Sequence, residues 1–173
     1  LLGLSYVVML PVFAREILRG GPKTLGFLMG STGIGALCGS LLLAARRGTN
    51  GLEKAIPASA GLFSTAVIGF AFSPFPATSY LLVALAGFGM ISTLASCNTM
   101  LQTLVDNTYR GRVMSLYTMA LVGIAPFGSL FSGWLTSEMG VRFSLAVGGA
   151  CCLVAAAWFW KRLSVFREAA QAA

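Results

Sequence analysis

Six apolar stretches separated by short polar turns make up most of the chain. Five of them cover residues 24–45, 55–72, 79–101, 113–136 and 143–160, each close to the roughly 20 residues that a helix needs to cross a bilayer core. A backbone inside hydrocarbon must satisfy its own hydrogen bonds, which a helix does. The sequence therefore predicts an all-α, polytopic membrane protein, built as a bundle of six transmembrane helices.

The composition also indicates a membrane protein. Hydrophobic residues make up 57% of the chain and charged residues only 10%, against roughly 25% charged residues in soluble proteins. The formal net charge is +7, but the basic residues are scattered between apolar stretches and form no continuous patch for a nucleic acid. We therefore expect the lipid bilayer to surround this chain, and we expect no nucleic-acid partner.

The first apolar stretch, residues 1–14, is shorter than the others. It has no initiator methionine and no basic segment ahead of it, so we expect the sequence to begin inside a transmembrane helix. On this interpretation residues 1–163 form a six-helix body whose first helix is truncated. Residues 164–173 would then form a cytoplasmic tail.

Lysine and arginine are unequally divided between the two ends of the predicted helices. Eight follow the second, fourth and sixth stretches: Arg46, Arg47, Lys54, Arg110, Arg112, Lys161, Arg162 and Arg167. Four follow the first, third and fifth: Arg15, Arg19, Lys23 and Arg142. Cytoplasmic loops carry the excess of basic residues, which predicts a cytoplasmic carboxyl terminus. The three basic residues of the loop 15–23 argue for the opposite orientation.

Ionisable residues are missing from the centre of every stretch, and the chain has no histidine. Intramembrane ionisable groups mark proton relays and ion sites, so their absence argues against a membrane protease, a metalloenzyme or a channel with a charged filter. The four cysteines form no C-x-x-C pair and lie in apolar stretches, which favours small buried side chains over metal ligands. We expect no metal, no cofactor and no enzymatic activity.

Glycines crowd the stretch 24–45. At 100° per residue, Gly26, Gly30 and Gly33 share one face of a helix, and Gly35 and Gly39 lie on nearly the opposite face. Small residues four apart let another helix approach closely in a bilayer, so we expect close packing on both sides. A nucleotide-binding loop is the alternative for such glycines, but it requires a preceding strand and a soluble fold.

The stretch 79–101 and the turn after it carry the most polar face. Four hydroxyl side chains fall within an arc of about 60°: Ser92, Ser96, Thr99 and Thr103. Asn98 and Gln102 share an adjacent face. Placing an amide group in hydrocarbon costs free energy unless the group is hydrogen-bonded or hydrated. This face is therefore a candidate wall of a solute cavity. Hydrogen bonding to neighbouring helices is the alternative. Ser5 and Tyr6 are weaker candidates for the same wall.

A compact charged element precedes the stretch 113–136. Asp106 lies four and six residues before Arg110 and Arg112, so these charges are candidates for a cytoplasmic gate that pairs in one conformation and separates in the other. Anchoring by positive residues at the membrane surface is the alternative for the arginines. Further along, Pro126 should kink the helix, and Gly128 should allow close packing.

Several short motifs occur in one order along nearly the whole chain. A Leu-Pro-x-Phe-Ala pattern stands at residues 10–14, and Leu-Gly followed by Gly-x-Gly-Ala-x-x-Gly lies at residues 25–39. An Asn…Gln…Asp…Arg-Gly-Arg-Val-Met-Ser series covers residues 98–115, and Pro-x-Gly-Ser covers residues 126–129. In these motifs and their order, the chain resembles the carboxyl-terminal half of a major facilitator superfamily transporter. The branch it resembles holds enterobactin-type siderophore exporters and transmembrane secretion effectors.

The resemblance implies that the six stretches are helices seven to twelve of a twelve-helix fold. In that family, helices seven and ten line the central cavity, eight and eleven contact the other half, and nine and twelve face lipid. The loop after the eighth helix often carries an acidic residue before its basic ones, whereas residues 44–47 here read Ala-Ala-Arg-Arg. This departure weakens any charge-relay role for that loop.

These observations together predict half of a secondary transporter in a bacterial inner membrane. It would export a small organic molecule, such as a drug or siderophore, by alternating access against a missing amino-terminal six-helix half. The alternative from another class is a non-transporting six-helix membrane anchor or assembly subunit, which would have no solvent-accessible cavity.

Overall fold

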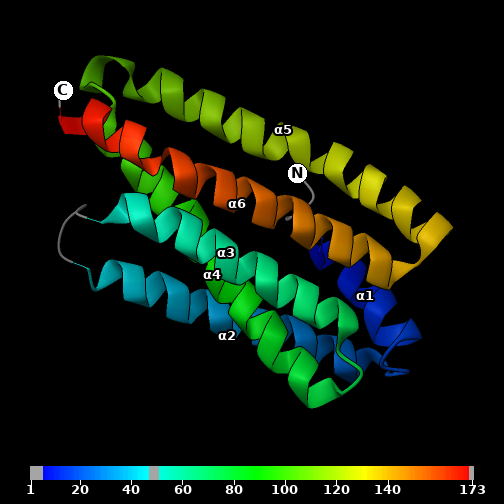
Figure 1. The fold of residues 1–173 in the computed structure, drawn as a ribbon. Coiled ribbons are helices and arrows are strands. Elements are labelled where there is room, and N and C mark those ends of the chain that lie inside the picture. Colours follow the sequence, from blue (N-terminus) through cyan, green and yellow to red (C-terminus); the bar gives the residue numbers. More distant parts are fainter. Residues whose placement is uncertain (1–5, 47–50, 172–173) are drawn as a thin grey trace.

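The described residues form six helices, which Figure 1 shows as a bundle. The computed structural model describes residues 6–46 and 51–171, with side chains described as far as Arg162. The helices are α1 (Tyr6–Glu16), α2 (Pro22–Ala44), α3 (Leu52–Phe72), α4 (Pro76–Leu104), α5 (Asn107–Met139) and α6 (Val141–Gln171). The described residues contain no strand, so the predicted all-α class is confirmed.

Helices α2 to α6 are each long and apolar enough to cross a membrane. Helix α1 is not among them, because it has only 11 residues. The five long helices confirm the prediction of a polytopic membrane bundle.

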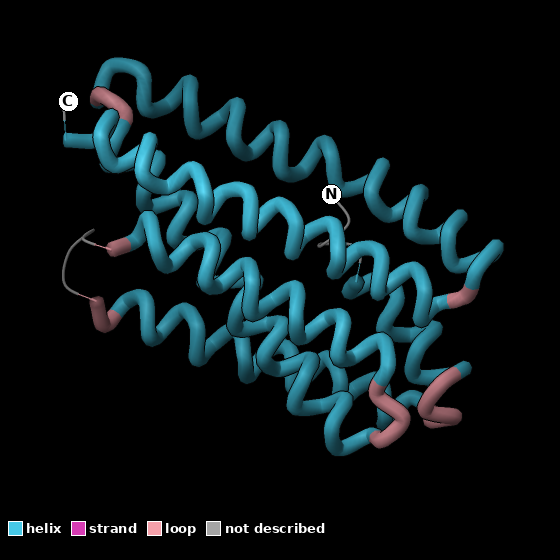
Figure 2. Tube along the Cα trace, viewed as in Figure 1, coloured by secondary structure: helices cyan, strands magenta, loops and turns pink. Residues whose placement is uncertain are grey.

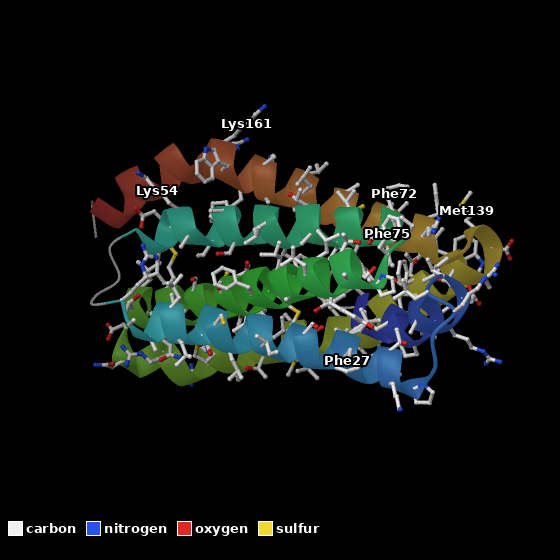
Figure 3. The ribbon with its side chains drawn as sticks, turned by 90° about the horizontal axis from the view of Figure 1, so that it is seen from below. Phe27, Lys54, Phe72, Phe75, Met139 and Lys161 are labelled. Atoms are coloured by element: carbon white, nitrogen blue, oxygen red, sulfur yellow. The ribbon has the colours of Figure 1, made fainter. Side chains whose placement is uncertain are left out.

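Successive long helices run in alternating directions. The α2–α3 and α4–α5 connections lie at one end of the bundle, with the end of α6, and the remaining loops lie at the other end (Figures 1 and 2). Figure 3 shows Lys54 and Lys161 in the half of the bundle opposite Phe72, Phe75 and Met139. The basic residues at the start of α3 and late in α6 therefore lie toward the same end.

Helix breaks follow from local chemistry. Pro76 occupies the first turn of α4, where its missing N–H costs nothing, and Ser79 donates a hydrogen bond to the Ser73 hydroxyl at 3.1 Å. The predicted turn at residues 137–142 shrinks to Gly140 alone, whose φ of +86° and ψ of +161° suit glycine.

The helices extend beyond the apolar stretches that predicted them. Helix α5 begins at Asn107 instead of residue 113, and α6 continues through Gln171, so the residues after 163 prolong this helix. Apolar residues mark only the hydrocarbon core, whereas helical hydrogen bonds continue through the headgroup layers.

The hydrophobic core is formed mainly by α1 and α3, with a few residues from α2, α4 and α6. Helix α4 packs against α2 on one side and α3 on the other, and α3 also packs against α6. Large side chains of α1, including Leu10 and Phe13, fill the centre and are fully buried. Helix α5 is different, because its only buried residues are Gly128, Ser132 and Leu135, all in its second half. Most of α5 therefore presents apolar side chains to its surroundings.

Candidate functional site

Helices α2 and α4 meet along a seam of glycines. A Cβ atom at Gly35 would collide with the Ala84 carbonyl, and one at Gly87 would collide with the Thr32 carbonyl. A Cβ atom at Gly39 would lie 2.8 Å from the Ser92 hydroxyl oxygen. Only glycine fits at these positions, and Ser92 is held against α2 as a result.

The second glycine face of α2 has no partner among the described residues. Cβ atoms at Gly26, Gly30 and Gly33 would meet nothing within 4 Å. Large apolar side chains on the surface of α2, such as Ile34 and Leu41, are more than 60% exposed. The structure thus brings Gly35 and Gly39 into the bundle and leaves the other three glycines on its surface.

Three buried hydroxyl groups have no hydrogen-bond partner in the described parts of the chain. They belong to Tyr6, Ser92 and Ser96, and all three are among the residues that the sequence assigns to a cavity wall. The Tyr6 hydroxyl lies near the Thr32 hydroxyl of α2 but makes no hydrogen bond of ordinary geometry with it. A buried polar group left unsatisfied costs about 1–3 kcal/mol, so each of these groups needs an explanation. Ser5, which the sequence suggests for the same wall, lies outside the described residues.

Ser92 lies at the edge of the α2–α4 seam. At 100° per residue it shares a stripe of α4 with Leu85 and Thr99, both of which are exposed. Ser96, one turn further along α4, is 1% exposed. The two serines therefore lie at the boundary between the buried face and the exposed face of α4.

Tyr6 lies at the junction of several helices. Its ring packs edge-on against Phe63 of α3, with ring centroids 5.5 Å apart. It also lines a small cavity of about 10 Å³ together with Ser132 of α5 and Ser144 of α6, close to the minimum space for one water molecule. Ser144 donates a hydrogen bond to the Ser132 carbonyl at 3.1 Å.

These contacts of α5 were not apparent from the sequence. The Thr136 hydroxyl lies 3.0 Å from the Met9 sulfur and also donates to the Ser132 carbonyl of its own helix at 2.8 Å. Ser144 joins α6 to α5 as described above. Ser144 is a lone hydroxyl in an apolar stretch, so no repeating pattern marked it. Together these bonds fix the second half of α5 to α1 and α6.

The two amides of α4 pair with each other. Gln102 donates a hydrogen bond from Nε2 to Asn98 Oδ1 at 2.7 Å. Asn98 is half-buried, and Gln102 is exposed two residues before α4 ends. The pair therefore extends from the open face of α4 to its end, at the same end of the bundle as Lys54.

The charged element lies in the α4–α5 connection and the first turns of α5. The Asp106 carbonyl accepts hydrogen bonds from the backbone N–H groups of Tyr109 and Arg110, both at 3.0 Å. Asp106, Arg110 and Arg112 are all exposed, and no ion pair joins the aspartate to either arginine in this described segment. The charges are thus available to groups outside it.

Pro126 divides α5 into two parts. The part after it carries the three buried residues, including Gly128, whereas the part before it has none. Exposed side chains of the first part include Leu116, Met119 and Val122. The proline therefore separates a packed segment of α5 from an unpacked one.

The described residues show no group of three His, Cys, Asp or Glu side chains that could hold a metal ion. All four cysteines are described, and none is in a disulfide.

Comparisons with known proteins agree with this arrangement. The model of one protein family, described as "transmembrane secretion effector", matches residues 1–173, the full length of the sequence. No similar curated protein and no similar solved structure were found. Because this match covers the whole sequence, the chain belongs to the transmembrane secretion effector family of the major facilitator superfamily.

Proposed function

We propose that this chain forms one six-helix half of a secondary transporter that exports a small organic molecule. The carrying observation is the set of three buried hydroxyl groups without a partner, on Tyr6, Ser92 and Ser96. In a protein of this family, a transported solute or the water around it would supply the missing hydrogen bonds.

The position of these groups supports a midplane site. Ser92 lies near the middle of α4, which runs from Pro76 to Leu104. Phe63, against which the Tyr6 ring packs, lies near the middle of α3. Secondary transporters bind their solutes near the bilayer midplane, between two halves that rock against each other. The glycine face of α2 that contacts nothing in the described residues, and the exposed first part of α5, would then contact the other six-helix half of the transporter.

The charges support one orientation. Six described basic residues lie toward one end of the bundle: Arg46, Lys54, Arg110, Arg112, Lys161 and Arg162. By the positive-inside rule this end would face the cytoplasm of a bacterial cell, and the carboxyl terminus with it. Asp106, Arg110 and Arg112 would then form part of the cytoplasmic gate, with their counter-charges on the other half.

Transport by the full-length protein tests the role of the unpartnered hydroxyls. The assay would follow efflux of the dye Hoechst 33342 and of a catecholate siderophore from cells that lack their own exporters. Tyr6→Phe and Ser96→Ala each remove a buried hydroxyl that has no partner, so the variants should be as stable as the parent or more stable. Export of at least one probe should nevertheless fall about tenfold, equivalent to about 1.4 kcal/mol.

Ser64→Ala is the matched control. Ser64 is also fully buried, but its hydroxyl donates to the Ala60 carbonyl at 2.7 Å. This variant should lose a little stability and retain full export. Parental export by both Tyr6→Phe and Ser96→Ala would overturn the assignment of these hydroxyls to the solute site.

Cysteine accessibility separates a transporter from a membrane anchor. In a cysteine-less full-length protein, single cysteines at positions 92–103 would be treated with a small charged thiol reagent. A transporter should show a reactive stripe that includes Thr99→Cys and Gln102→Cys, whereas uniform protection across the scan would favour the anchor.

A further inference from the structure

An apolar cavity of about 340 Å³ lies between α3, α4 and α6, with one residue of α5 in its wall. Its lining includes Ile56 and Phe63 of α3, Met90 of α4, and Cys152 and Phe159 of α6. For scale, an apolar cavity of about 150 Å³ holds one benzene molecule. An occupant larger than a single aromatic ring therefore fits inside.

The wall of this cavity is almost entirely apolar. Thr93 is the one hydroxyl residue in the lining, and its hydroxyl already donates to the Gly89 carbonyl of its own helix at 2.7 Å. The remaining lining is aliphatic, aromatic or sulfur-containing. Burying a polar group without a hydrogen-bond partner costs free energy, so the part of a ligand that enters the cavity should be a hydrocarbon.

Two glycine contacts keep the cavity open. A Cβ atom at Gly89 of α4 would lie 2.7 Å from the Ser59 carbonyl oxygen of α3, and one at Gly149 of α6 would lie 3.2 Å from the Ser64 carbonyl oxygen. These contacts fix the distances from α3 to both neighbouring helices, while small lining residues such as Ala156 leave the space between them unfilled. Because an unfilled cavity lowers stability, an occupant would stabilise the bundle.

The register of α3 and α6 places the cavity toward one end of the bundle. Gly149 of α6 lies against Ser64 and Ile68 of α3, and the two helices run in opposite directions (Figure 1). Ten residues further along α6, Phe159 is therefore level with the first turns of α3, where Ile56 lies. Both residues belong to the cavity wall, so the cavity begins close to the end of the bundle where α3 starts.

Basic side chains surround that end of the cavity. Lys54 lies in the first turn of α3, and Lys161 and Arg162 follow Phe159 on α6; all three are exposed. Figure 3 shows Lys54 and Lys161 toward the same end of these packed helices. Glu53 is half-buried beside Lys54, so these four residues bring three positive charges and one negative charge. We call Lys54, Lys161 and Arg162 the basic mouth, and its charge favours an anionic group.

Arg162 connects the basic mouth to the cavity. Its guanidinium lies over the ring of Trp158, 5.8 Å from the ring centroid, and this tryptophan is 60% exposed. Tryptophan at a membrane surface lies at the level of the lipid headgroups. At 100° per residue Arg162 also shares a face of α6 with Ala155 and Phe159, both in the cavity wall. A headgroup at Arg162 would therefore have its hydrocarbon part beside the cavity.

We propose that this cavity binds an acyl chain of an anionic phospholipid whose phosphate is held by the basic mouth. Basic pockets between transmembrane helices are typical sites for anionic headgroups on the cytoplasmic side. The ligand is a lipid of the surrounding membrane and is not exported. Phe63, which packs against Tyr6, is the point where this lipid site meets the proposed solute site.

Native mass spectrometry tests the headgroup. The protein would be delipidated in detergent and titrated with phosphatidylglycerol or with phosphatidylethanolamine that carries the same acyl chains. We expect the parent to retain one phosphatidylglycerol and to bind the zwitterionic lipid more weakly. Arg162→Gln should weaken phosphatidylglycerol binding about fivefold, the effect expected for one basic residue near an anionic surface.

Arg142→Gln is the matched control for the headgroup, because it removes an exposed arginine at the opposite end of the same helix. This variant should bind phosphatidylglycerol as the parent does. Equal binding of the two lipids by the parent, or equal binding of phosphatidylglycerol by Arg162→Gln and Arg142→Gln, would overturn the proposal.

Filling the cavity tests the place of the acyl chain. Ala60→Leu and Ala156→Leu together would occupy the cavity from α3 and α6, so the double variant should lose most of its phosphatidylglycerol binding. Ala58→Leu with Ala157→Leu is the matched control, because both alanines are exposed on the same two helices. Thermal unfolding without lipid would establish that each protein is folded, and the single substitutions would replace a double variant that is not. Parental binding by the folded cavity variants would overturn the proposal.

Competition separates a membrane lipid from an exported solute. Hoechst 33342 and the catecholate siderophore should leave the bound phosphatidylglycerol in place. Displacement of the lipid by either probe would assign the cavity to the solute and would overturn the proposal. Binding is measured without transport, so the loss of the lipid site would leave the proposed export function untouched.

Discussion

Gly35 of α2 and the carbonyl oxygen of Ala84 in α4 are so close that a Cβ atom on Gly35 would overlap that oxygen. The two helices therefore touch backbone to backbone at this point. Close approach of this kind is how helices associate in a bilayer, where lipid provides no hydrophobic drive for packing. Because Ser92 lies two turns further along the same seam, this contact also fixes the position of a proposed solute-site residue.

Gly35→Ala should destabilise the protein. The added methyl group would meet backbone that cannot move aside, and overpacking of this kind costs about 1–3 kcal/mol or more. Thermal unfolding in detergent should therefore begin at a clearly lower temperature. Gly61→Ala on α3 is the control, since a Cβ atom there meets nothing within 4 Å and alanine is the better helix former by up to about 1 kcal/mol. Equal stability of the two variants would contradict the contact.

Gly33→Leu should affect transport without preventing folding. Nothing in the described residues lies within 4 Å of a Cβ atom at Gly33, so the six-helix bundle accommodates the larger side chain. In the proposed transporter this face of α2 contacts the other half, and leucine there should block the rocking motion. Export should fall at least tenfold at normal expression, whereas Gly61→Leu should leave it unchanged. Normal export by Gly33→Leu would remove α2 from the interface between the halves.

The apolar pattern predicted the class of fold and most of the helices, because membrane spans are set by length and hydrophobicity alone. It did not predict which glycine face of α2 packs against another helix of the chain. Gly30 and Gly35 each belong to a small-residue pattern that permits close packing, and only the tertiary contacts distinguish the two faces. Likewise, the pairing of Gln102 with Asn98 follows from their four-residue spacing. The burial of Ser92, in contrast, depends on the close approach of α2 at Gly39. The link from Thr136 to Met9 joins residues far apart in sequence and has no local signal.

Gly140→Ala should destabilise the turn between α5 and α6. The φ of +86° and ψ of +161° at Gly140 fall in a region that is essentially restricted to glycine, so alanine should cost about 1–3 kcal/mol. Chemical unfolding in mixed micelles would measure this change. Gly111→Ala in α5 offers the comparison, because a Cβ atom there is unobstructed and the substitution should be neutral or stabilising. If Gly140→Ala proved as stable as Gly111→Ala, the described turn would be incorrect.

Asp106→Asn should impair the proposed gate without changing stability. The carboxylate of Asp106 is exposed and makes no capping hydrogen bond to α5, so the neutral amide should change the unfolding temperature very little. If the charge pairs with a basic group on the other half in one conformation, its loss should shift the balance between the two conformations and reduce export several-fold. Glu138→Gln is the control, because it neutralises another exposed acidic side chain at the opposite end of α5 and should retain export. Restored export in Asp106→Glu would establish that charge is what the gate requires, and parental export by Asp106→Asn would exclude Asp106 from the gate.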